Sequence, residues 1–238
     1  MNGSPAETAM RALVTVRAFE LAAVDPLLSR LLDPSEHARA GNFTDESARR
    51  DFLAGRVIQR LNAAELLGVR PESLQAAYWC PDCGTEPVPS HGRPGYLADG
   101  APAAISLSLS RSRGWALLAM APFPGCGIGA DVQHVESVGF VGFDGVALGA
   151  AERSRLQNVA PGGQDAWRAA AWARKEALAK QSGLGLRTDP ACIDAFPDPA
   201  SEVVVWDVDA AGLPAGFAAA VAISAGGVPA TLPGRATG

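Results

Sequence analysis

We expect an α+β fold, because short apolar strand patterns alternate with stretches of helical spacing and the alternation occurs twice along the chain. The segment Ala121-Pro-Phe-Pro-Gly125 separates the two cycles and is the one mid-chain stretch typical of a linker. A chain of 238 residues with 48% hydrophobic content can bury a full core in one or two compact lobes. The linker therefore predicts two lobes, residues 1–120 and 121–238.

The first lobe is predicted from apolar spacing and from Gly and Pro punctuation. In order, its elements are a strand over 11–20, an amphipathic helix over 47–67 that ends at Gly68, a Pro- and Gly-rich loop over 81–102, and strands over 104–109 and 115–121 around the turn 111–114. The ends of the chain, 1–10 and 230–238, are small-residue, Gly and Pro segments that we expect to be frayed.

The second lobe repeats the order of strand, helix and strand. We expect a strand that ends at Val132, helices over about 150–159 and 165–182, and strands near 202–208 and 217–224. The second helix of this lobe ends before Gly183 and Gly185, as expected just past a helix C-terminus.

Charge and composition narrow the function classes. The net charge of −5 disfavours a nucleic-acid binder, which normally carries a basic excess. No apolar run approaches the ~20 residues of a membrane span, and the amino terminus lacks a charged-then-apolar signal pattern. Four cysteines are too few for a disulfide scaffold at this size. We therefore expect a cytoplasmic protein with reduced thiols and no membrane or nucleic-acid partner.

The most informative motif lies on the helix predicted over 165–182. Trp172, Glu176 and Lys180 are spaced i, i+4 and i+8, so they share one face of that helix. Taken alone, Glu176 and Lys180 are an exposed pair worth a few tenths of a kcal/mol. A function is favoured only because a second carboxylate, Asp131, ends a short apolar strand pattern about 45 residues upstream.

Two isolated carboxylates suit a magnesium ion bound to a phosphate ester. Mg²⁺ takes one or two protein carboxylates and completes its octahedron with water and phosphate oxygens. Asp131 and Glu176 are therefore the candidate metal ligands. We expect them to add little to folding, since unpaired carboxylates around an empty site repel each other.

The two motifs together resemble the Sfp-type 4′-phosphopantetheinyl transferases. Their signatures read roughly G-[IV]-D-[IV]-E and W-x-x-K-E-[AS]-x-x-K-x-x-G-x-G. The first is similar to the segment 127–133, and the second is met in full by Trp172, Lys175, Glu176, Ala177, Lys180, Gly183 and Gly185. Four family elements lie in register between about residues 35 and 190, so the resemblance is strong although each motif alone is weak.

Further family elements lie upstream in the expected order. Segment 91–94 (His-Gly-Arg-Pro) looks like the G-K-P element, and segment 108–112 (Ser-Leu-Ser-Arg-Ser) ahead of Trp115 looks like the N-[IL]-S-H-S element. Segment 39–56 resembles the amino-terminal helix region, and Arg39 falls on the position of a coenzyme-binding arginine; the alternative is a surface arginine. The residues that the resemblance assigns to coenzyme binding are Arg39, His91, Gly92, Arg93, Pro94, Ser110, Arg111, Asp131, Glu176 and Lys180.

The resemblance implies a fold and a reaction. The fold is two similar α/β lobes related by a pseudo-twofold, with coenzyme A nucleotide contacts on residues 1–120 and the metal site and carrier contacts on 121–238. The reaction is Mg²⁺-dependent transfer of the 4′-phosphopantetheine group of coenzyme A to a serine of an apo acyl or peptidyl carrier protein, giving holo-carrier protein and 3′,5′-ADP. Asp131, Glu176 and Lys180 are the expected catalytic residues, with Glu176 also the candidate base.

This chain departs from the family pattern at two positions. Gln133 stands where the first motif usually ends in Glu; its amide oxygen is a third candidate metal ligand but lacks the charge, so water is the alternative. Arg111 replaces the His that contacts the coenzyme A 3′-phosphate in the family, and a guanidinium suits a phosphate at least as well. A solvated turn arginine is the alternative for Arg111.

Other assignments stay open at this stage. Cys80, Cys83 and His91 have partial zinc spacing, but a structural site needs four ligands and no fourth is evident, so a thiol-bearing loop is favoured. A monomer is expected, but the carrier (fatty-acid, polyketide or nonribosomal peptide synthase) is undetermined. The rival functions are a Mg²⁺-dependent coenzyme A or nucleotide phosphohydrolase and a non-catalytic carrier-binding homologue.

An acidic carrier would be repelled by this acidic chain, so recognition needs a local basic or apolar patch. The nearest basic candidates are Arg153, Arg155, Arg168 and Arg174.

Overall fold

The computed structural model describes residues 5–79, 92–198, 201–209 and 212–224. Over these ranges the chain is a mixed α+β protein with three small sheets and several helices. The helices are α1 (Pro5–Ala12), α2 (Pro34–Ala40), α3 (Glu46–Leu67), α4 (Phe143–Ala147), α5 (Ala150–Gln157) and α6 (Gln164–Ser182). The strands are β1 (Thr15–Glu20), β2 (Leu74–Trp79), β3 (Arg93–Ala98), β4 (Ala101–Pro102), β5 (Ser106–Ser112), β6 (Trp115–Ala121), β7 (Ile128–His134), β8 (Val203–Asp207) and β9 (Phe217–Ser224).

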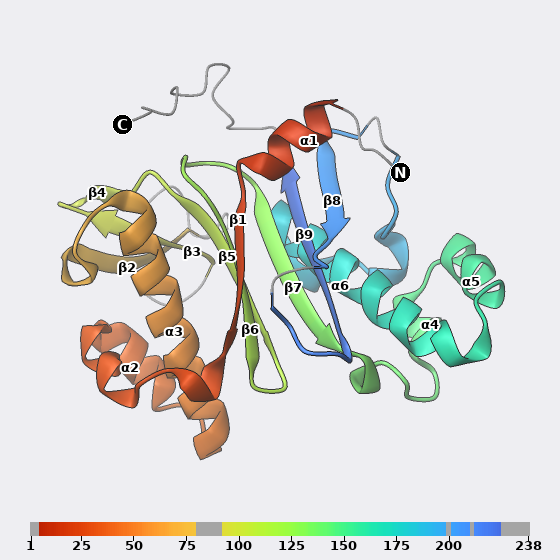
Figure 1. Cartoon of the computed structure of the whole chain (residues 1–238), viewed down its shortest axis with the longest axis horizontal. Coiled ribbons are helices and arrows are strands. Elements are labelled where there is room, and N and C mark those ends of the chain that lie inside the picture. Colours follow the sequence, from red (N-terminus) through yellow and green to blue (C-terminus); the bar gives the residue numbers. More distant parts are fainter. Residues whose placement is uncertain (1–4, 80–91, 199–200, 210–211, 225–238) are drawn as a thin grey trace.

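The three sheets are each three-stranded. Their strand orders are β1-β6-β5, β2-β3-β4 and β7-β9-β8, and all of these pairings are antiparallel. The first and third sheets meet along β5 and β7, which run side by side at the centre of Figure 1. This seam between β5 and β7 joins the amino-terminal and carboxy-terminal halves of the molecule.

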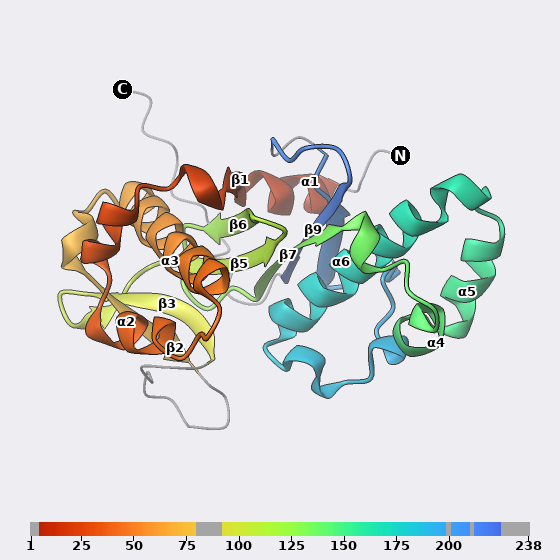
Figure 2. The same ribbon diagram turned by 90° about the horizontal axis from the view of Figure 1, so that it is seen from below.

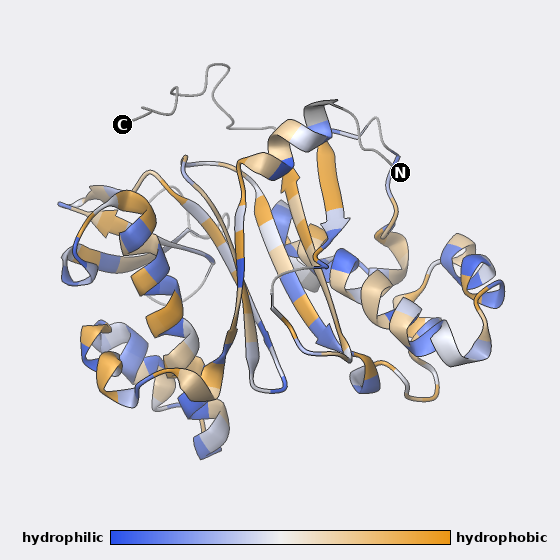
Figure 3. Ribbon diagram, viewed as in Figure 1, coloured by the Kyte–Doolittle hydropathy of each residue, from blue (hydrophilic) through white to orange (hydrophobic). Residues whose placement is uncertain are grey.

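Helices cover the sheets on opposite sides of that seam. Figure 2 shows α2 and α3 on one side and α4, α5 and α6 on the other. The core of the first half packs α3, through Ile58 and Ala63, against Leu107 and Leu118 of the first sheet. The opposite face of that sheet packs against β7 and β9; Figure 3 shows β9 as mostly hydrophobic and β7 as hydrophilic toward its end. An apolar core of β6, β7 and β9 side chains therefore lies beside the seam, whereas β5 contributes polar serine side chains to the seam itself.

The two long helices begin and end where the sequence indicates. The Asp45 carboxylate accepts a hydrogen bond from the Ala48 backbone N–H at the start of α3, and Gly68 ends it in the left-handed conformation. Gly183 ends α6 in the same conformation, at φ 77°. The strands predicted over 104–109, 115–121, 202–208 and 217–224 are confirmed as β5, β6, β8 and β9, with small shifts in the bounds of β5 and β8.

Three expectations were wrong. Residues 5–10, expected to be frayed, belong to α1, whose Met10 packs on the apolar core of the seam. Part of the expected loop 81–102 is strand, because β3 pairs with β2, an element that the sequence pattern did not reveal. The first predicted strand begins only at Thr15.

Helices in the described residues are not long and apolar enough to cross a membrane. The pseudo-twofold relation between the lobes and the boundary at residue 120 stay predictions.

Candidate active site

Asp131 lies on β7 with its side chain turned toward α6 and only 6% exposed. The helix can approach because Gly129, two residues earlier on the same strand face, has no side chain: a Cβ there would lie 1.8 Å from the Ala177 carbonyl oxygen. Gly129 thus marks the point where α6 crosses β7.

An ammonium and a hydroxyl converge on the Asp131 carboxylate. Lys180 Nζ lies 2.6 Å from Asp131 Oδ1, and Ser110 Oγ donates to the same oxygen at 2.6 Å. Lys180 Nζ also donates to Ser110 Oγ at 3.1 Å and to the Ala130 carbonyl at 3.2 Å. The sequence-predicted Ser110, Asp131 and Lys180 therefore form one hydrogen-bonded cluster drawn from β5, β7 and α6.

This pairing corrects one expectation. Asp131 is not an unpaired carboxylate, because its Oδ1 is held by Lys180 and Ser110. Lys180 keeps 31% of its side chain exposed, whereas the Asp131 side chain is only 6% exposed. The ion pair therefore contributes to the stability of the fold. Because Asp131 is more deeply buried than Lys180, removal of one partner should change that stability by a different amount than removal of the other.

Glu176 lies one helical turn before Lys180 on α6 and is partly buried. Burial is the main cause that raises the pKa of its carboxyl above the usual glutamate range; the Lys180 ammonium opposes this rise and the Asp131 carboxylate adds to it. A cation bound between the two carboxylates would relieve the effect of Asp131 on Glu176.

A divalent cation fits the remaining donor atoms. Asp131 Oδ2 is a buried oxygen without a hydrogen-bond partner, and a buried unsatisfied oxygen is costly unless a ligand completes it. Strand alternation places Gln133 on the same face of β7 as Asp131. No cluster of three or more His, Cys, Asp or Glu side chains occurs in the described ranges, so any ion here must take water or substrate oxygens as well.

A cluster of arginines lies on the other side of β5. The guanidinium carbons of Arg39, Arg56 and Arg111 lie 5.6, 5.3 and 5.5 Å from the ring centre of Phe52. Burial lowers the pKa of Arg111 first of all, and Arg56 and Arg39 lower it further while Asp51 opposes them. Three guanidinium groups around one ring make a strongly positive site for an anion such as a phosphate.

Local features of α2 and α3 place these arginines. Gly55 leaves room for the Arg111 stem, since a Cβ at residue 55 would lie 3.1 Å from Arg111 Cδ. Arg60, 1% exposed, ties α3 to α2 through ion pairs at 2.8 Å to Asp33 and to Glu36. Arg39, on α2, is thereby held beside the ring of Phe52.

Arg56 also belongs to this arginine cluster, although its sequence pattern indicated only that it lies in the helix region 39–56. Its spacing was a usable signal, because Phe52, Gly55, Arg56 and Gln59 share one face of α3. These four residues line a small cavity together with Pro94, Leu109 and Arg111.

Lys175, a motif residue, has a structural position. It is fully buried, pairs with the Glu152 carboxylate at 2.6 Å, and donates to the Pro190 and Ile193 carbonyls at 2.8 and 2.7 Å. Lys175 therefore fixes the segment after α6 and does not face Asp131.

The structure describes only residues 92–94 of segment 91–94, which we expected to bind the coenzyme. Gly92 has a positive φ of 102°, and Pro94 lines the cavity of the arginine cluster. The Arg93 guanidinium instead donates to the Gln181 carbonyl at 2.6 Å, at the end of α6. Cys80, Cys83 and His91 lie outside the described residues.

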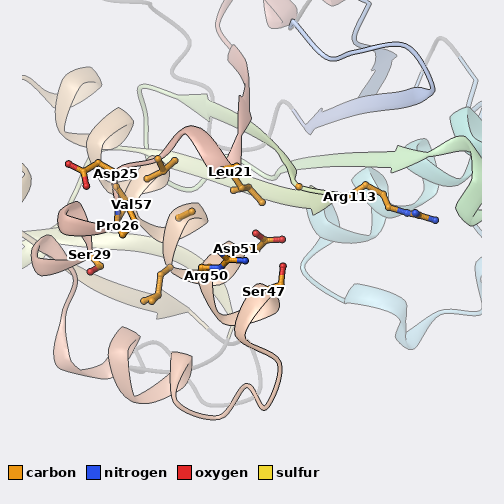
Figure 4. A pocket seen from close by; sticks show the side chains of 14 residues that line it. Leu21, Asp25, Pro26, Ser29, Ser47, Arg50, Asp51, Val57 and Arg113 are labelled. Carbon is orange, nitrogen blue, oxygen red and sulfur yellow. The ribbon is translucent and has the colours of Figure 1, made fainter.

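A cavity that is larger than the one at this site lies elsewhere. It has a volume of about 490 Å³ and lies between α3 and the segment 21–29, as Figure 4 shows. A second cavity of about 360 Å³ contains Ser110, Arg111 and Lys180 and shares only Asp51, Arg113 and Gly114 with the first. We place the site in the second cavity because the converging charges lie there.

Comparison with known protein families finds a similarity for one segment of the carboxy-terminal half. Residues 127–212 match the 4′-phosphopantetheinyl transferase superfamily. The matched segment runs through β7, α6 and β8 and includes Asp131, Glu176 and Lys180. No protein of curated function matches the chain.

Proposed function

We propose that the protein is an Sfp-type 4′-phosphopantetheinyl transferase that moves the 4′-phosphopantetheine group of coenzyme A to a serine of an apo carrier protein. One observation carries this proposal: a carboxylate–ammonium cluster at Asp131 and Lys180 lies across β5 from three arginines. The first suits a diphosphate with its metal ion, and the second suits a separate phosphate. Coenzyme A carries both groups.

The transfer is a phosphoryl substitution. The carrier serine oxygen forms a bond to the β-phosphorus, the bond from that phosphorus to the bridging oxygen breaks, and its electron pair leaves on 3′,5′-ADP. Asp131 and Glu176 would hold Mg²⁺, which supplies charge neutralisation on the diphosphate. Lys180 contributes a positive charge for a diphosphate oxygen, and the arginine cluster fixes the 3′-phosphate.

Glu176 is the proposed acceptor of the serine proton. Burial raises the pKa of its carboxyl, and a base whose pKa is nearer to neutrality holds a proton better than an ordinary glutamate. The same carboxylate would also face the metal ion, so the proton passes to it directly or through one water.

The acceptor protein requires a surface beside Glu176. Two of the four basic candidates are neutralised, since Arg168 pairs with Asp144 and Arg174 pairs with Asp207. The apolar alternative is better supported: Phe140, Val141 and Val146 are exposed on the segment that follows β7.

This apolar surface connects to the site through aromatic contacts. Trp172, one turn before Glu176, contacts Phe143, and Phe143 contacts Phe140. We propose that the carrier docks on the surface formed by Phe140, Val141 and Val146, where burial of apolar groups offsets repulsion between two acidic proteins.

The direct test is mass spectrometry of several apo-carriers after incubation with coenzyme A and Mg²⁺. A mass increase of one phosphopantetheinyl group, dependent on the carrier serine, supports the proposal. A phosphohydrolase would release 3′,5′-ADP without any carrier. A non-catalytic homologue would bind coenzyme A and modify nothing. Either result contradicts the proposed transfer.

A further inference from the structure

Four serines occupy alternate positions along β5, at residues 106, 108, 110 and 112. Three of their hydroxyls bond to residues of β7, and that of Ser106 bonds to the segment just before β7. Ser106 Oγ accepts from the Cys126 N–H at 3.1 Å, Ser108 Oγ from the Ala130 N–H at 3.0 Å, and Ser112 Oγ from the His134 N–H at 3.3 Å. The fourth, Ser110, bonds the Asp131 carboxylate. We call the hydroxyls of Ser106, Ser108 and Ser112 with their three backbone partners the serine ladder.

The ladder follows from strand geometry. Residues two apart on β5 point to the same side, so one face of this strand presents a row of hydroxyls to β7. The facing N–H groups belong to residues four apart, Cys126 just before β7 and Ala130 and His134 on it, and a buried N–H without an acceptor would be costly. Side-chain oxygens thus satisfy backbone groups along the edge at which the first and third sheets meet.

Ser108 holds the residue that precedes the key carboxylate. It is 6% exposed, and its hydroxyl accepts from the N–H of Ala130. The carbonyl of the same Ala130 accepts from Lys180 Nζ. Ala130 is therefore fixed at its N–H by the first sheet and at its carbonyl by α6, immediately before Asp131.

We propose that Ser108 is a positioning residue for the transfer site. Its bond to Ala130 sets the Asp131 carboxylate at a fixed place relative to β5, the strand that also carries Arg111. Since the anion cluster and the carboxylate must engage two parts of one coenzyme, the register of this seam determines whether both engage at once. This inference rests on the proposed function.

The decisive comparison is Ser108→Thr against Ser108→Val. The two side chains have the same shape, so the pair isolates the hydroxyl from any effect of the added methyl group. We expect Ser108→Val to lower kcat by about fivefold to tenfold relative to Ser108→Thr, the effect of one buried hydrogen bond on a reacting geometry, with KM for coenzyme A within about twofold.

Two readouts do not depend on turnover. Amide hydrogen exchange followed by NMR should show faster exchange of the Ala130 N–H in Ser108→Val than in Ser108→Thr. Calorimetric titration with Mg²⁺ in the presence of coenzyme A should show weaker metal binding in the same variant.

Ser106→Ala is the matched control, because it removes a comparable ladder bond from Cys126, five residues before Asp131. It should lower thermal stability and leave kcat and Mg²⁺ affinity unchanged.

Equal kcat and equal Mg²⁺ affinity in Ser108→Thr and Ser108→Val would overturn the inference. So would a loss of kcat in Ser106→Ala as large as that in Ser108→Val, because the ladder would then act only through stability. Failure of the unsubstituted protein to modify any carrier contradicts the proposed function instead. In that case exchange at Ala130 and Mg²⁺ binding still decide whether Ser108 positions the Asp131 site.

Discussion

Lys180 Nζ lies 2.6 Å from Asp131 Oδ1, an ion pair that joins α6 to β7 across 49 residues of sequence. The aspartate is buried and the lysine is partly exposed, so removal of either partner has a different consequence. A lysine left alone can turn toward water, whereas an aspartate left alone remains a buried charge.

The first prediction follows from this asymmetry. Lys180→Met should reduce the free energy of unfolding by about 3–5 kcal/mol at neutral pH, while Asp131→Asn should cost clearly less. Both should reduce transfer at least a hundredfold, since each removes a charge that faces the diphosphate. Urea denaturation and single-turnover assays measure the two effects. Equal stability losses would contradict the proposed role of burial.

Arg111 gives the second prediction. Arg111→Ala should raise KM for coenzyme A by roughly one to two orders of magnitude, the loss of a charge-assisted contact worth about 1.5–3 kcal/mol. The variant should barely distinguish coenzyme A from 3′-dephospho-coenzyme A. Arg70→Ala, at an exposed arginine that pairs with Glu72 away from this cavity, is the control. An Arg111→Ala protein that still prefers the 3′-phosphorylated donor as strongly would place the phosphate elsewhere.

Glu176 makes stability depend on pH in a predictable direction. Its pKa is raised in the folded state, so the folded protein holds this proton more tightly than the unfolded chain. The stabilisation is complete below the unfolded pKa and is lost as the pH rises through the folded pKa. Without metal, Glu176→Gln should therefore melt above the unsubstituted protein at pH 7–8, and this advantage should shrink toward pH 4.

Addition of Mg²⁺ and coenzyme A supplies the control for that measurement. A bound cation favours the ionised carboxyl, so the unsubstituted protein should then melt higher than Glu176→Gln at pH 7–8. If Glu176→Gln raised the melting temperature by the same amount at every pH, burial would not shift the pKa of the Glu176 carboxyl.

Gln133 gives the fourth prediction. Gln133→Glu adds an anionic oxygen on the face of β7 that carries Asp131, so it should tighten Mg²⁺ binding without coenzyme and lower the Mg²⁺ needed for half-maximal rate. The turnover number at saturating metal should change little. Gln75→Glu, an exposed position on β2, makes the same charge change away from the site. Unchanged metal affinity in Gln133→Glu would show that residue 133 does not face the ion.

The carrier surface gives the fifth prediction. Val141 is fully exposed in the segment between β7 and α4. Val141→Asp should raise KM for the carrier roughly tenfold, because a buried contact becomes a charge beside an acidic partner, and leave KM for coenzyme A unchanged. Val69→Asp, at a valine 38% exposed after α3, is the matched control. Equal effects of the two substitutions would remove this surface from consideration.

The sequence by itself determined the elements whose signals are local. The bounds of α3 and α6 follow from apolar spacing and from Gly68 and Gly183, since helix ends depend on neighbouring residues. The face shared by Glu176 and Lys180 is a consequence of the helical period alone.

Tertiary structure decided what depends on distant partners. The short strands β2 and β3 are stabilised by pairing with each other, and α1 by packing on the core of the seam, so no local pattern predicted them. The ion pair of Asp131 with Lys180 and the place of Arg56 in the arginine cluster arise where separate elements meet. Lys175 belongs to the sequence motif, but its ion pair with Glu152 gives it a structural position that the motif did not predict. Local spacing fixes the direction of a side chain on its own element, whereas only the packing of elements fixes which group that side chain reaches.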